Sequence, residues 1–584
     1  MKKLNVIWIL GESVRNYSGT ERYSKYPLFD KLKKTDNGVI CNNVVVAAPS
    51  TIMSQSSMLT GIAPTYLSRT FADFNYDQNK WSSIYKILTS NGYTSYAGWY
   101  HIEGNSLFKK LQPTIKDEQL PQGITHNSFW TSEDLNKVLQ KLIDDKLESP
   151  FFLMLNYNNQ DDTNDYIEKA YNLLNDKGLL ENTLFLFCPD HGWPDNNRNS
   201  STKRHESVVT DANILINLYL QYPNASSIIK EKEIDQLIAS TDILPTILDI
   251  LEIPKEQYQL QGQSILPLIT EETNSDAKYT RDKFRVDQRF LLQKGRVVCI
   301  RGQRYKYVIN IDQNTEELFD TKNDPDEKNN ISKSEKEIHQ AILKEFQTEF
   351  QKNENQLIEF HQNDLITAAL PKISKLLNEN KKDHYNILLL GSAHPLFIKA
   401  LIKTVQKITD NYSIDLIIQP TAFKKVNLDA EDNIKIHFIE IEEKQYEHTK
   451  SYTNELKRKE FKQYSGKINV PHLSIDYQAF LKKRDQLSTN DYDLAIVPLD
   501  NPYGVGHQEL SKIAKSVNPK NIIYLDYNMN EKKPTHWLIN GLKLLNAKRG
   551  HYLKNPKSFL QEIKRYFYSV GIIKNDPVDN MNKK

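Results

Sequence analysis

The stretch CNNVVVAAPSTIMSQSSMLTG, residues 41–61, leads from an apolar strand through Ala-Ala-Pro into a segment with helical spacing of Ile, Met and Leu. Hydroxyl side chains crowd the opening of this helix, among them Ser50, Thr51 and Ser54. One interpretation is an N-cap, but a cap needs only one hydroxyl. The other is a nucleophile at the helix N-terminus, where the helix dipole favours an anionic group. The rest of the chain bears on this choice.

Composition describes a large chain without a dominant charge. At about 150 residues per domain, 584 residues predict two to four domains. Lys and Arg number 76 against 74 Asp and Glu, so we expect no nucleic-acid partner. Three cysteines, each in or beside an apolar run, indicate reduced thiols and a cytoplasmic location, with the inner membrane face as an alternative site of action. Because no apolar run approaches about 18 residues, we expect no transmembrane segment.

Residues 1–275 alternate short apolar runs, such as NVIWIL, FFLMLNY and TLFLFCPD, with helical stretches. This rhythm predicts an α/β core with a mostly parallel sheet and helices on both faces. The predicted order after the core is a small antiparallel subdomain, a helical connector that Pro371 interrupts, a Rossmann-like α/β domain and a polar tail, over residues 276–345, 346–383, 384–570 and 571–584. In the Rossmann-like domain Gly391 stands without the other glycines of a dinucleotide fingerprint, which favours close packing over phosphate binding.

Polar residues follow the predicted strands of the core, where open parallel sheets bind their ligands. Glu12 follows the first strand, and Asp190 and His191 follow the fifth. With the Thr51 hydroxyl they offer four ligands, a set that suits Zn²⁺ or Mn²⁺ better than Ca²⁺, with Mg²⁺ or Ca²⁺ as alternatives. A metal bound to Thr51 would lower the pKa of its hydroxyl and activate it as a nucleophile.

Several motifs resemble, in order and spacing, the sulfatase-like branch of the alkaline phosphatase superfamily. The resemblance covers residues 1–345 and rests on NVIWILGESVRNYSG, APSTIMSQSSMLTGIAP, GYTSYAGWYHIEG, ENTLFLFCPDHGWPDN, HESVVTDANILI and STDILPTILDILEIPKEQYQLQGQSILPLI. It implies that the first region is the catalytic core, with Glu12, Asp190 and His191 as metal ligands. By the spacing to Gly61 it also implies Thr51 as the nucleophile, with Ser50 as the alternative.

The departures from the family pattern guide the functional prediction. Type I sulfatases convert a cysteine or serine in C/S-x-P-S-R to formylglycine, whereas this chain has Thr51-Ile-Met-Ser-Gln. At the position of the first-strand metal ligand, the single carboxylate of Glu12 is similar to the pattern of phosphoethanolamine and phosphoglycerol transferases. We therefore predict a metal-dependent phospho-substituent transferase that acts through a covalent phospho-threonine at Thr51, with a glycan or activated sugar as its candidate substrate. The alternatives are a phosphodiesterase or phosphomonoesterase, a sulfatase, and a non-catalytic sulfatase-like binding module.

The resemblance and the strand ends supply further candidate residues. His101 and His205 are predicted to protonate the leaving oxygen or to hold a non-bridging oxygen. A substrate-binding role is predicted for five residues, which are Ser54, Asn156, Trp193, Lys203 and Arg204. The predicted partners are a small-molecule or lipid- or sugar-linked phosphoester donor and a glycan acceptor.

Overall fold

A computed structural model of the chain divides into two compact units, residues 1–354 and residues 355–584. It describes residues 3–13, 27–69, 80–99, 131–157, 163–193, 209–221, 229–270, 278–289, 295–311, 313–379, 381–391, 393–418, 433–439, 477–487, 491–499, 508–526 and 528–532, with single positions between them.

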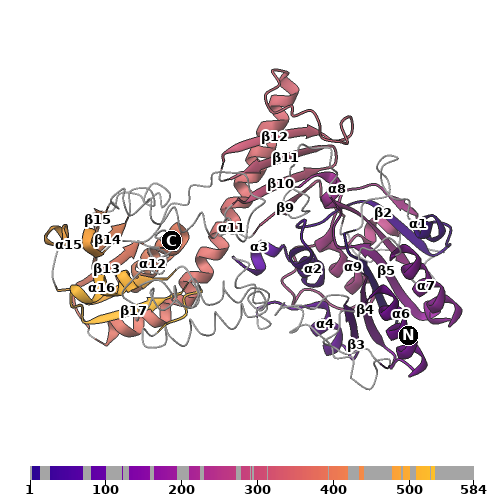
Figure 1. The fold of residues 1–584 in the computed structure, drawn as a ribbon, viewed down its shortest axis with the longest axis horizontal. Helices are drawn as coiled ribbons and strands as arrows, with labels where there is room; N and C mark the ends of the chain where they lie inside the picture. Colours follow the sequence, from indigo (N-terminus) through magenta and orange to yellow (C-terminus); the bar gives the residue numbers. More distant parts are fainter. Residues whose placement is uncertain are drawn as a thin grey trace, which may run out of the picture. The chain divides into compact units, whose positions relative to one another are not determined.

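An eight-stranded sheet forms the centre of the first unit (Figure 1). Its strands pair in the order β3-β4-β1-β5-β6-β2-β7, with β8 beside β2. Its strands are β1 Asn5–Gly11, β2 Gly38–Val45, β3 Thr94–Trp99, β4 Phe151–Tyr157, β5 Thr183–Pro189, β6 Leu215–Gln221, β7 Glu233–Ile234 and β8 Ile238–Ala239. Strand β6 is antiparallel to β5 and to β2, whereas β3, β4, β1 and β5 pair in parallel. The mostly parallel α/β core is therefore confirmed, and β2 runs in the direction of β1.

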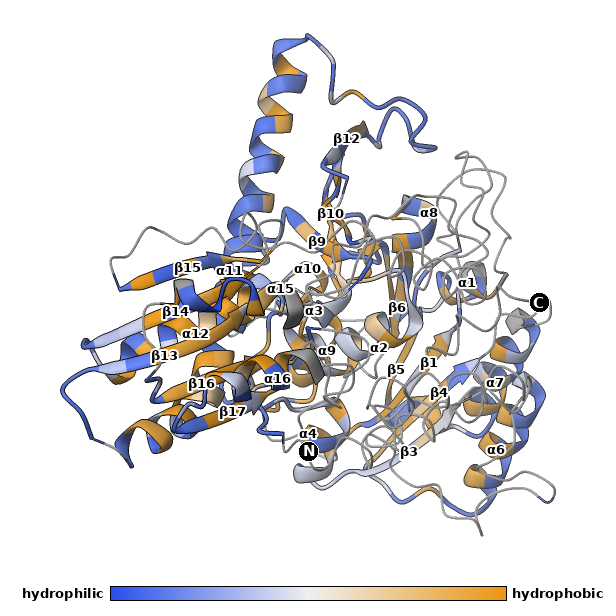
Figure 2. Ribbon diagram, turned by 60° about the vertical axis from the view of Figure 1, so that its left-hand side comes forward, coloured by the Kyte–Doolittle hydropathy of each residue, from blue (hydrophilic) through white to orange (hydrophobic). Residues whose placement is uncertain are grey.

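Helices cover both faces of this sheet (Figure 2). On one face, α6 (Ser132–Asp144) and α7 (Thr163–Asp176) bury their apolar side chains against Leu153, Leu155 and other alternate strand residues. The side chains between them point the other way, because successive residues of a strand face opposite sides. There the ring of Tyr85, from α4 (Ile84–Ser90), lies 5.0 Å from the ring of Phe152. Helices α2 (Thr51–Thr60) and α9 (Ile243–Ile250) lie on this second side (Figure 1).

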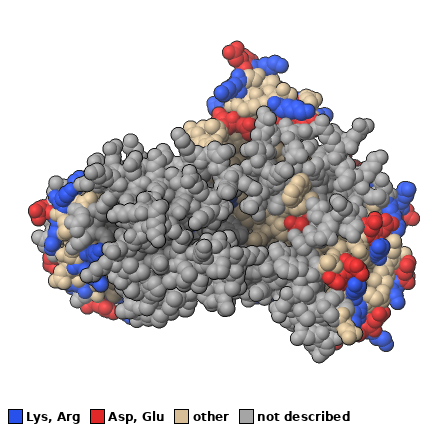
Figure 3. All heavy atoms as spheres, in the orientation of Figure 1, with Lys and Arg blue, Asp and Glu red and all other residues tan. Residues whose placement is uncertain are grey.

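The solvent side of α6 carries charges of both signs. A capping box between Thr131 and Asp134 begins the helix. Lys137 Nζ lies 2.8 Å from Glu133 along the exposed face. Basic and acidic side chains are intermixed over this part of the surface (Figure 3). Paired charges on one face and apolar residues on the other are the pattern of a helix that packs on a sheet and faces water.

A four-stranded antiparallel sheet follows the core, as the sequence predicts. Its order is β12-β11-β10-β9, with β9 Lys283–Asp287, β10 Val297–Gly302, β11 Tyr305–Asn310 and β12 Thr315–Asp320. Leu343 and Phe346 of the long helix α11 (Glu337–Asn378) pack against it. The expected interruption at Pro371 is wrong, because α11 continues through it. Ala369 and Ile373, on either side of the proline, are fully buried, and this packing outweighs the lost backbone hydrogen bond.

A buried ionic cluster ties the small sheet to α11. Asp287 Oδ2 accepts from Arg285 Nε at 2.7 Å, and Asp287 Oδ1 accepts from Arg296 Nη2 at 2.9 Å. The same two arginines also donate to Glu354, each over 2.7 Å. Burial by itself raises the pKa of both carboxyl groups, but the arginines outweigh it and hold both pKa values below their ordinary range. The backbone N–H of Asp287 donates to Ala47 O at 3.0 Å, so the cluster also contacts the core.

Replacing Glu354 tests this cluster. We expect Glu354→Gln to lower the free energy of unfolding by about 3 kcal/mol at pH 7, because two buried guanidinium groups lose a charged partner. A carboxyl group with a lowered folded-state pKa stabilises fully above its ordinary pKa, here 4.5, and progressively less as the pH falls toward the folded-state value. The difference between the wild type and the variant should therefore shrink below pH 4.5 in denaturant titrations followed by tryptophan fluorescence.

The matched control is Glu345→Gln on the same helix. Glu345 pairs with Lys283 at 2.7 Å on the surface, with more than half of its side chain exposed. Such a pair contributes about 1 kcal/mol or less. A difference for Glu354→Gln that stays constant or widens as the pH falls would show that its carboxylate charge does not stabilise the fold.

The second unit contains a parallel sheet in the order β15-β14-β13-β16-β17, which confirms the predicted Rossmann-like α/β character. Its strands are β13 Tyr385–Gly391, β14 Tyr412–Ile418, β15 Ile434–Phe438, β16 Leu494–Pro498 and β17 Asn521–Leu525. A Cβ atom at Gly391 would lie 2.8 Å from the Cβ of Ile418 on the neighbouring strand. The glycine thus permits close packing, as predicted. Among the described helices of the whole chain, none has the length and apolar content needed to span a membrane.

Candidate active site

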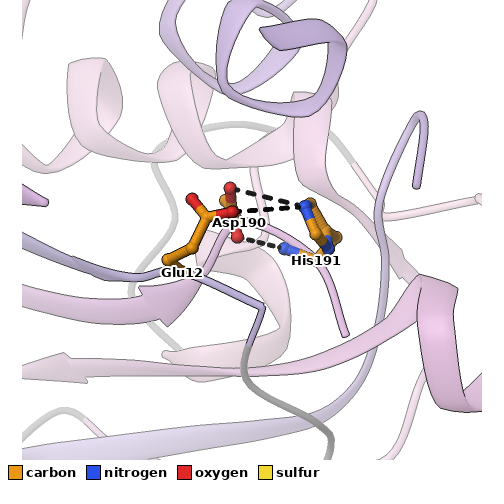
Figure 4. A group of neighbouring side chains, drawn as sticks. All are labelled: Glu12, Asp190 and His191. Atoms are coloured by element: carbon orange, nitrogen blue, oxygen red, sulfur yellow. Dashed lines mark hydrogen bonds and ion pairs between the residues drawn. The ribbon is translucent and has the colours of Figure 1, made fainter. Parts of the chain in front are cut away.

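The carboxyl ends of two neighbouring strands bring three predicted metal ligands together. Glu12 directly follows β1, and Asp190 and His191 directly follow β5, which pairs with β1 in parallel up to Gly11 and Pro189. One ligand atom from each of the three side chains lies within 4.8 Å of the others. Both carboxylates point toward the imidazole ring (Figure 4). All three residues are buried, so the geometry is that of a compact cation site at the edge of the sheet.

Hydrogen bonding fixes the tautomer of His191. Its Nδ1 lies 2.7 Å from the carbonyl oxygen of Gly192, which can only accept, so Nδ1 carries the proton. The other ring nitrogen, Nε2, faces Glu12 Oε1 at 3.8 Å and Asp190 Oδ2 at 3.7 Å. A backbone carbonyl on the far nitrogen is the usual way in which proteins orient a metal-binding histidine.

Three donors hold Asp190 in place. Its Oδ1 accepts from the backbone N–H of Ser13 at 2.9 Å and from that of His191 at 2.8 Å. Its Oδ2 accepts from Gln55 Nε2 at 3.2 Å. Gln55 is not among the site residues predicted from the sequence. The signal was its position four residues after Thr51, since residues four apart share a face of a helix.

Thr51 is the first residue of α2 and faces the same site. Its Oγ1 donates to Glu12 Oε1 at 2.8 Å and lies 3.2 Å from His191 Nε2. Ser50 occupies the N-cap position, yet its side chain makes no capping hydrogen bond. Ser54 Oγ donates to the carbonyl oxygen of Asp190 at 2.5 Å. The Thr51 hydroxyl therefore binds the Glu12 carboxylate, the Ser54 hydroxyl binds the backbone of Asp190, and the Ser50 side chain does not supply the simple N-cap.

The two buried carboxyl groups of the cluster would be stabilised by a bound cation. Burial first, and then the nearby charge of Asp190, raise the pKa of Glu12 to about 8. Burial also raises the pKa of Asp190 to about 6, although hydrogen bonds from Ser13 and His191 act in the opposite direction. Glu12 Oε2 is buried and has no hydrogen-bond partner among the described residues. Two buried carboxylates, one with a free oxygen, and an imidazole nitrogen fit a divalent metal ion.

The other predicted site residues divide into two groups. Asn156 is the next-to-last residue of β4, is buried, and pairs in register with Leu10 and Trp99. Trp193 follows Gly192 and is 38% exposed. The remaining predicted residues lie outside the described part of the chain, and they are His101, Lys203, Arg204 and His205.

This fold and this site define the alkaline phosphatase-like class of α/β proteins, and the comparisons with known proteins narrow the class. Residues 4–161 match the model of the sulfatase family, and residues 200–356 match that of the C-terminal region of N-sulphoglucosamine sulphohydrolase. The chain therefore carries a sulfatase-family domain.

Curated relatives bear the same family name. An ulvan-active sulfatase of Formosa agariphila is 29% identical over 155 residues, and a delta 4,5-hexuronate-2-O-sulfatase of Bacteroides thetaiotaomicron is 28% identical over 177 residues. These matches cover 26% and 29% of this chain but only 23% and 35% of the relatives. A crystallised sulfatase candidate from Bacteroides thetaiotaomicron shares the fold at a TM-score of 0.50 and 16% identity, over 61% of this chain and 93% of its own.

These comparisons correct the functional prediction. Phospho-substituent transfer through a phospho-threonine is contradicted, because the relatives are named as sulfatases and the C-terminal match is to a sulphohydrolase. The comparisons likewise do not show a particular closeness to phosphoethanolamine transferases. The prediction went wrong at Thr51. A threonine there excludes formylglycine, but it does not determine whether phosphorus or sulfur is attacked.

Proposed function

We propose that this chain is a metal-dependent sulfatase that hydrolyses sulfate esters of carbohydrates. The observation that carries the proposal is the contact of the Thr51 hydroxyl with the buried Glu12, Asp190 and His191 cluster, in a domain of the sulfatase family. The hydroxyl lies at the N-terminus of α2, where a helix favours an approaching anion. A sulfate ester is such an anion.

In the first step Thr51 Oγ1 attacks the sulfur atom, and a bond from this oxygen to sulfur forms as the bond from sulfur to the sugar oxygen breaks. The hydroxyl proton passes along the 2.8 Å hydrogen bond to Glu12 Oε1. The departing sugar oxygen takes a proton from an acid, for which His101 and His205 stay the predicted residues. A divalent cation on the cluster would lower the pKa of the hydroxyl and neutralise charge on the sulfate oxygens.

In the second step a water molecule attacks sulfur and breaks its bond to Thr51 Oγ1. Glu12 returns its proton to the threonine oxygen, and the proton from water restores the acid used in the first step. Sulfate leaves, and all groups recover their starting state. This route uses an unmodified threonine, so it does not require formylglycine.

The substrate class rests on the named relatives. One of them is named for ulvan and another for a hexuronate 2-O-sulfate. We therefore assign the sulfate esters of uronate-containing saccharides as the substrates to test first.

The identity of the metal rests on the donor set. His191 supplies a nitrogen ligand, and Thr51 supplies a hydroxyl beside two carboxylates. Nitrogen ligands favour Zn²⁺ or Mn²⁺, whereas Ca²⁺ prefers six to eight oxygen ligands. We propose Zn²⁺ or Mn²⁺ as the preferred ion, and we expect Mg²⁺ and Ca²⁺ to bind the same site more weakly.

The test compares four ester classes: sulfated uronate oligosaccharides, an aryl sulfate, an aryl phosphate monoester and an aryl phosphate diester. Each is assayed with Zn²⁺, Mn²⁺, Mg²⁺ or Ca²⁺ added to metal-depleted protein. We expect sulfate release from the oligosaccharides, with Zn²⁺ or Mn²⁺ giving the highest rate. Turnover of phosphate esters alone, or no sulfate release with any ion, would overturn the proposed function.

A further inference from the structure

A fully buried lysine lies in the small antiparallel sheet, away from the metal ligands. Lys306 of β11 donates from Nζ to Val209 O at 2.9 Å and to Asp211 Oδ1 at 3.0 Å, and it also contacts Glu327. Arg301 of β10 adds a hydrogen bond to Asp211 Oδ2 at 2.9 Å. Two cations and two carboxylates thus form a balanced ionic cluster.

The cluster also fixes the backbone of the core. The N–H of Asp211 donates to Glu327 Oε1 at 2.6 Å. Together with the lysine contact to Val209 O, this bond anchors the chain on both sides of Thr210. Arg301 and Lys306 outweigh the effect of burial and hold the pKa of Asp211 well below its ordinary value, so its charge persists. A buried ion pair is weak evidence for stability, which leaves positioning as the role to examine.

The anchored segment continues into α8 (Asp211–Ile214), and α8 contacts Gly192, the residue after the metal ligand His191. The carbonyl oxygen of Asn213 accepts from the N–H of Gly192 at 2.9 Å. A Cβ atom on Gly192 would lie 2.1 Å from the carbonyl oxygen of Ala212, so the two backbones touch and only glycine fits. The carbonyl of Gly192 in turn orients the His191 ring at 2.7 Å.

The same segment also contacts the chain between β2 and the predicted nucleophile. The carbonyl oxygen of Ile214 accepts from the N–H of Val46 at 2.9 Å, five residues before Thr51. Residues 209–214 therefore join the two sides of the candidate site, the loop with Gly192 and the chain that leads to Thr51.

We infer that Lys306 is a positioning residue for the metal centre: it fixes residues 209–214, which set the place of Gly192 and thereby the orientation of the His191 ring. The small sheet then has a role in metal binding although it supplies no ligand. This inference rests on the metal site of the proposed function, but not on the ester that is cleaved.

The experiment measures Mn²⁺ binding to the full-length chain by the electron paramagnetic resonance signal of the free ion. Lys306→Met keeps most of the side-chain volume and removes the charge and the hydrogen bonds. Because this leaves an excess of buried negative charge, the double variant Lys306→Met with Glu327→Gln restores the balance of one cation and one anion. We expect the dissociation constant for Mn²⁺ to rise by about tenfold or more in both variants, measured well below their unfolding temperatures.

The matched control is Arg304→Gln. Arg304 directly precedes β11 and pairs with Asp320 at 2.6 Å on the surface of the same sheet. Its loss should leave Mn²⁺ affinity unchanged. A folded double variant with wild-type affinity, or an equal loss in the control, would overturn the inference, and so would a wild-type protein that binds no Mn²⁺. A wild type that binds Mn²⁺ but cleaves no sulfate ester would contradict only the proposed function.

Discussion

Thr51→Ala is expected to lower kcat for sulfate release on the order of 10⁴-fold, while the protein remains folded and still binds metal through Glu12, Asp190 and His191. Removing a nucleophile eliminates the step that forms the covalent intermediate, and such substitutions cause losses of this size or larger in hydrolases. Thr51 is only half-buried, and its hydroxyl contacts Glu12 and His191 rather than the core. Steady-state sulfate release, with Mn²⁺ binding measured in parallel, separates the loss of chemistry from the loss of the site.

Two further variants sharpen this prediction. Thr51→Ser retains the hydroxyl and should stay within about tenfold of wild-type kcat. Ser50→Ala removes the neighbouring hydroxyl, which makes no capping hydrogen bond, and should leave the rate nearly unchanged. A large loss in Ser50→Ala with a small loss in Thr51→Ala would transfer the nucleophilic role to Ser50. Acid quenching during turnover, followed by mass spectrometry, should find the sulfated peptide in the segment with Thr51.

The place of the site could be predicted because its residues follow strands. Glu12 and Asp190 directly follow adjacent parallel strands, so the chain direction alone puts them at one edge of the sheet. Thr51 follows β2, which runs the same way, and the structure brings its hydroxyl within 2.8 Å of Glu12. Their roles as ligands and nucleophile stay predictions, since proximity shows only that the chemistry is geometrically available.

Other features depend on tertiary contacts that a sequence pattern does not record. The apolar run of β6 predicts a strand but gives no sign of its antiparallel direction. Pro371 signals a helix break, whereas burial of the residues around it keeps α11 continuous. In the sequence, Gln55 stands only as a departure from the arginine of the sulfatase motif. In the structure its side-chain amide donates to Asp190 Oδ2 at 3.2 Å, which places it in the site. The ester that is cleaved was predicted wrongly for a related reason, because Thr51 specifies the attacking atom and not the atom attacked.

Glu12→Gln is expected to separate metal binding from folding with effects of opposite sign. In metal-depleted wild-type protein, burial raises the pKa of Glu12 to about 8, and its Oε2 has no partner among the described residues. Folding at neutral pH must therefore either bury the charge or protonate the carboxylate, and glutamine removes this cost. The variant without metal should therefore be as stable as the wild type or more stable, by about 1 to 2 kcal/mol. Wild-type protein should gain about 2.7 kcal/mol at a metal concentration a hundred times the dissociation constant.

The variant should lose most of that gain, because its affinity for Zn²⁺ and Mn²⁺ is expected to fall by about a hundredfold when one charged ligand is replaced by an amide. Thermal unfolding with and without each ion measures both effects in one experiment. Glu256→Gln, at an exposed position, supplies the matched control and should keep the full metal-induced stabilisation. If Glu12→Gln were destabilised without metal yet still stabilised by Mn²⁺ as strongly as the wild type, Glu12 would be a structural carboxylate and the ion would have to bind elsewhere.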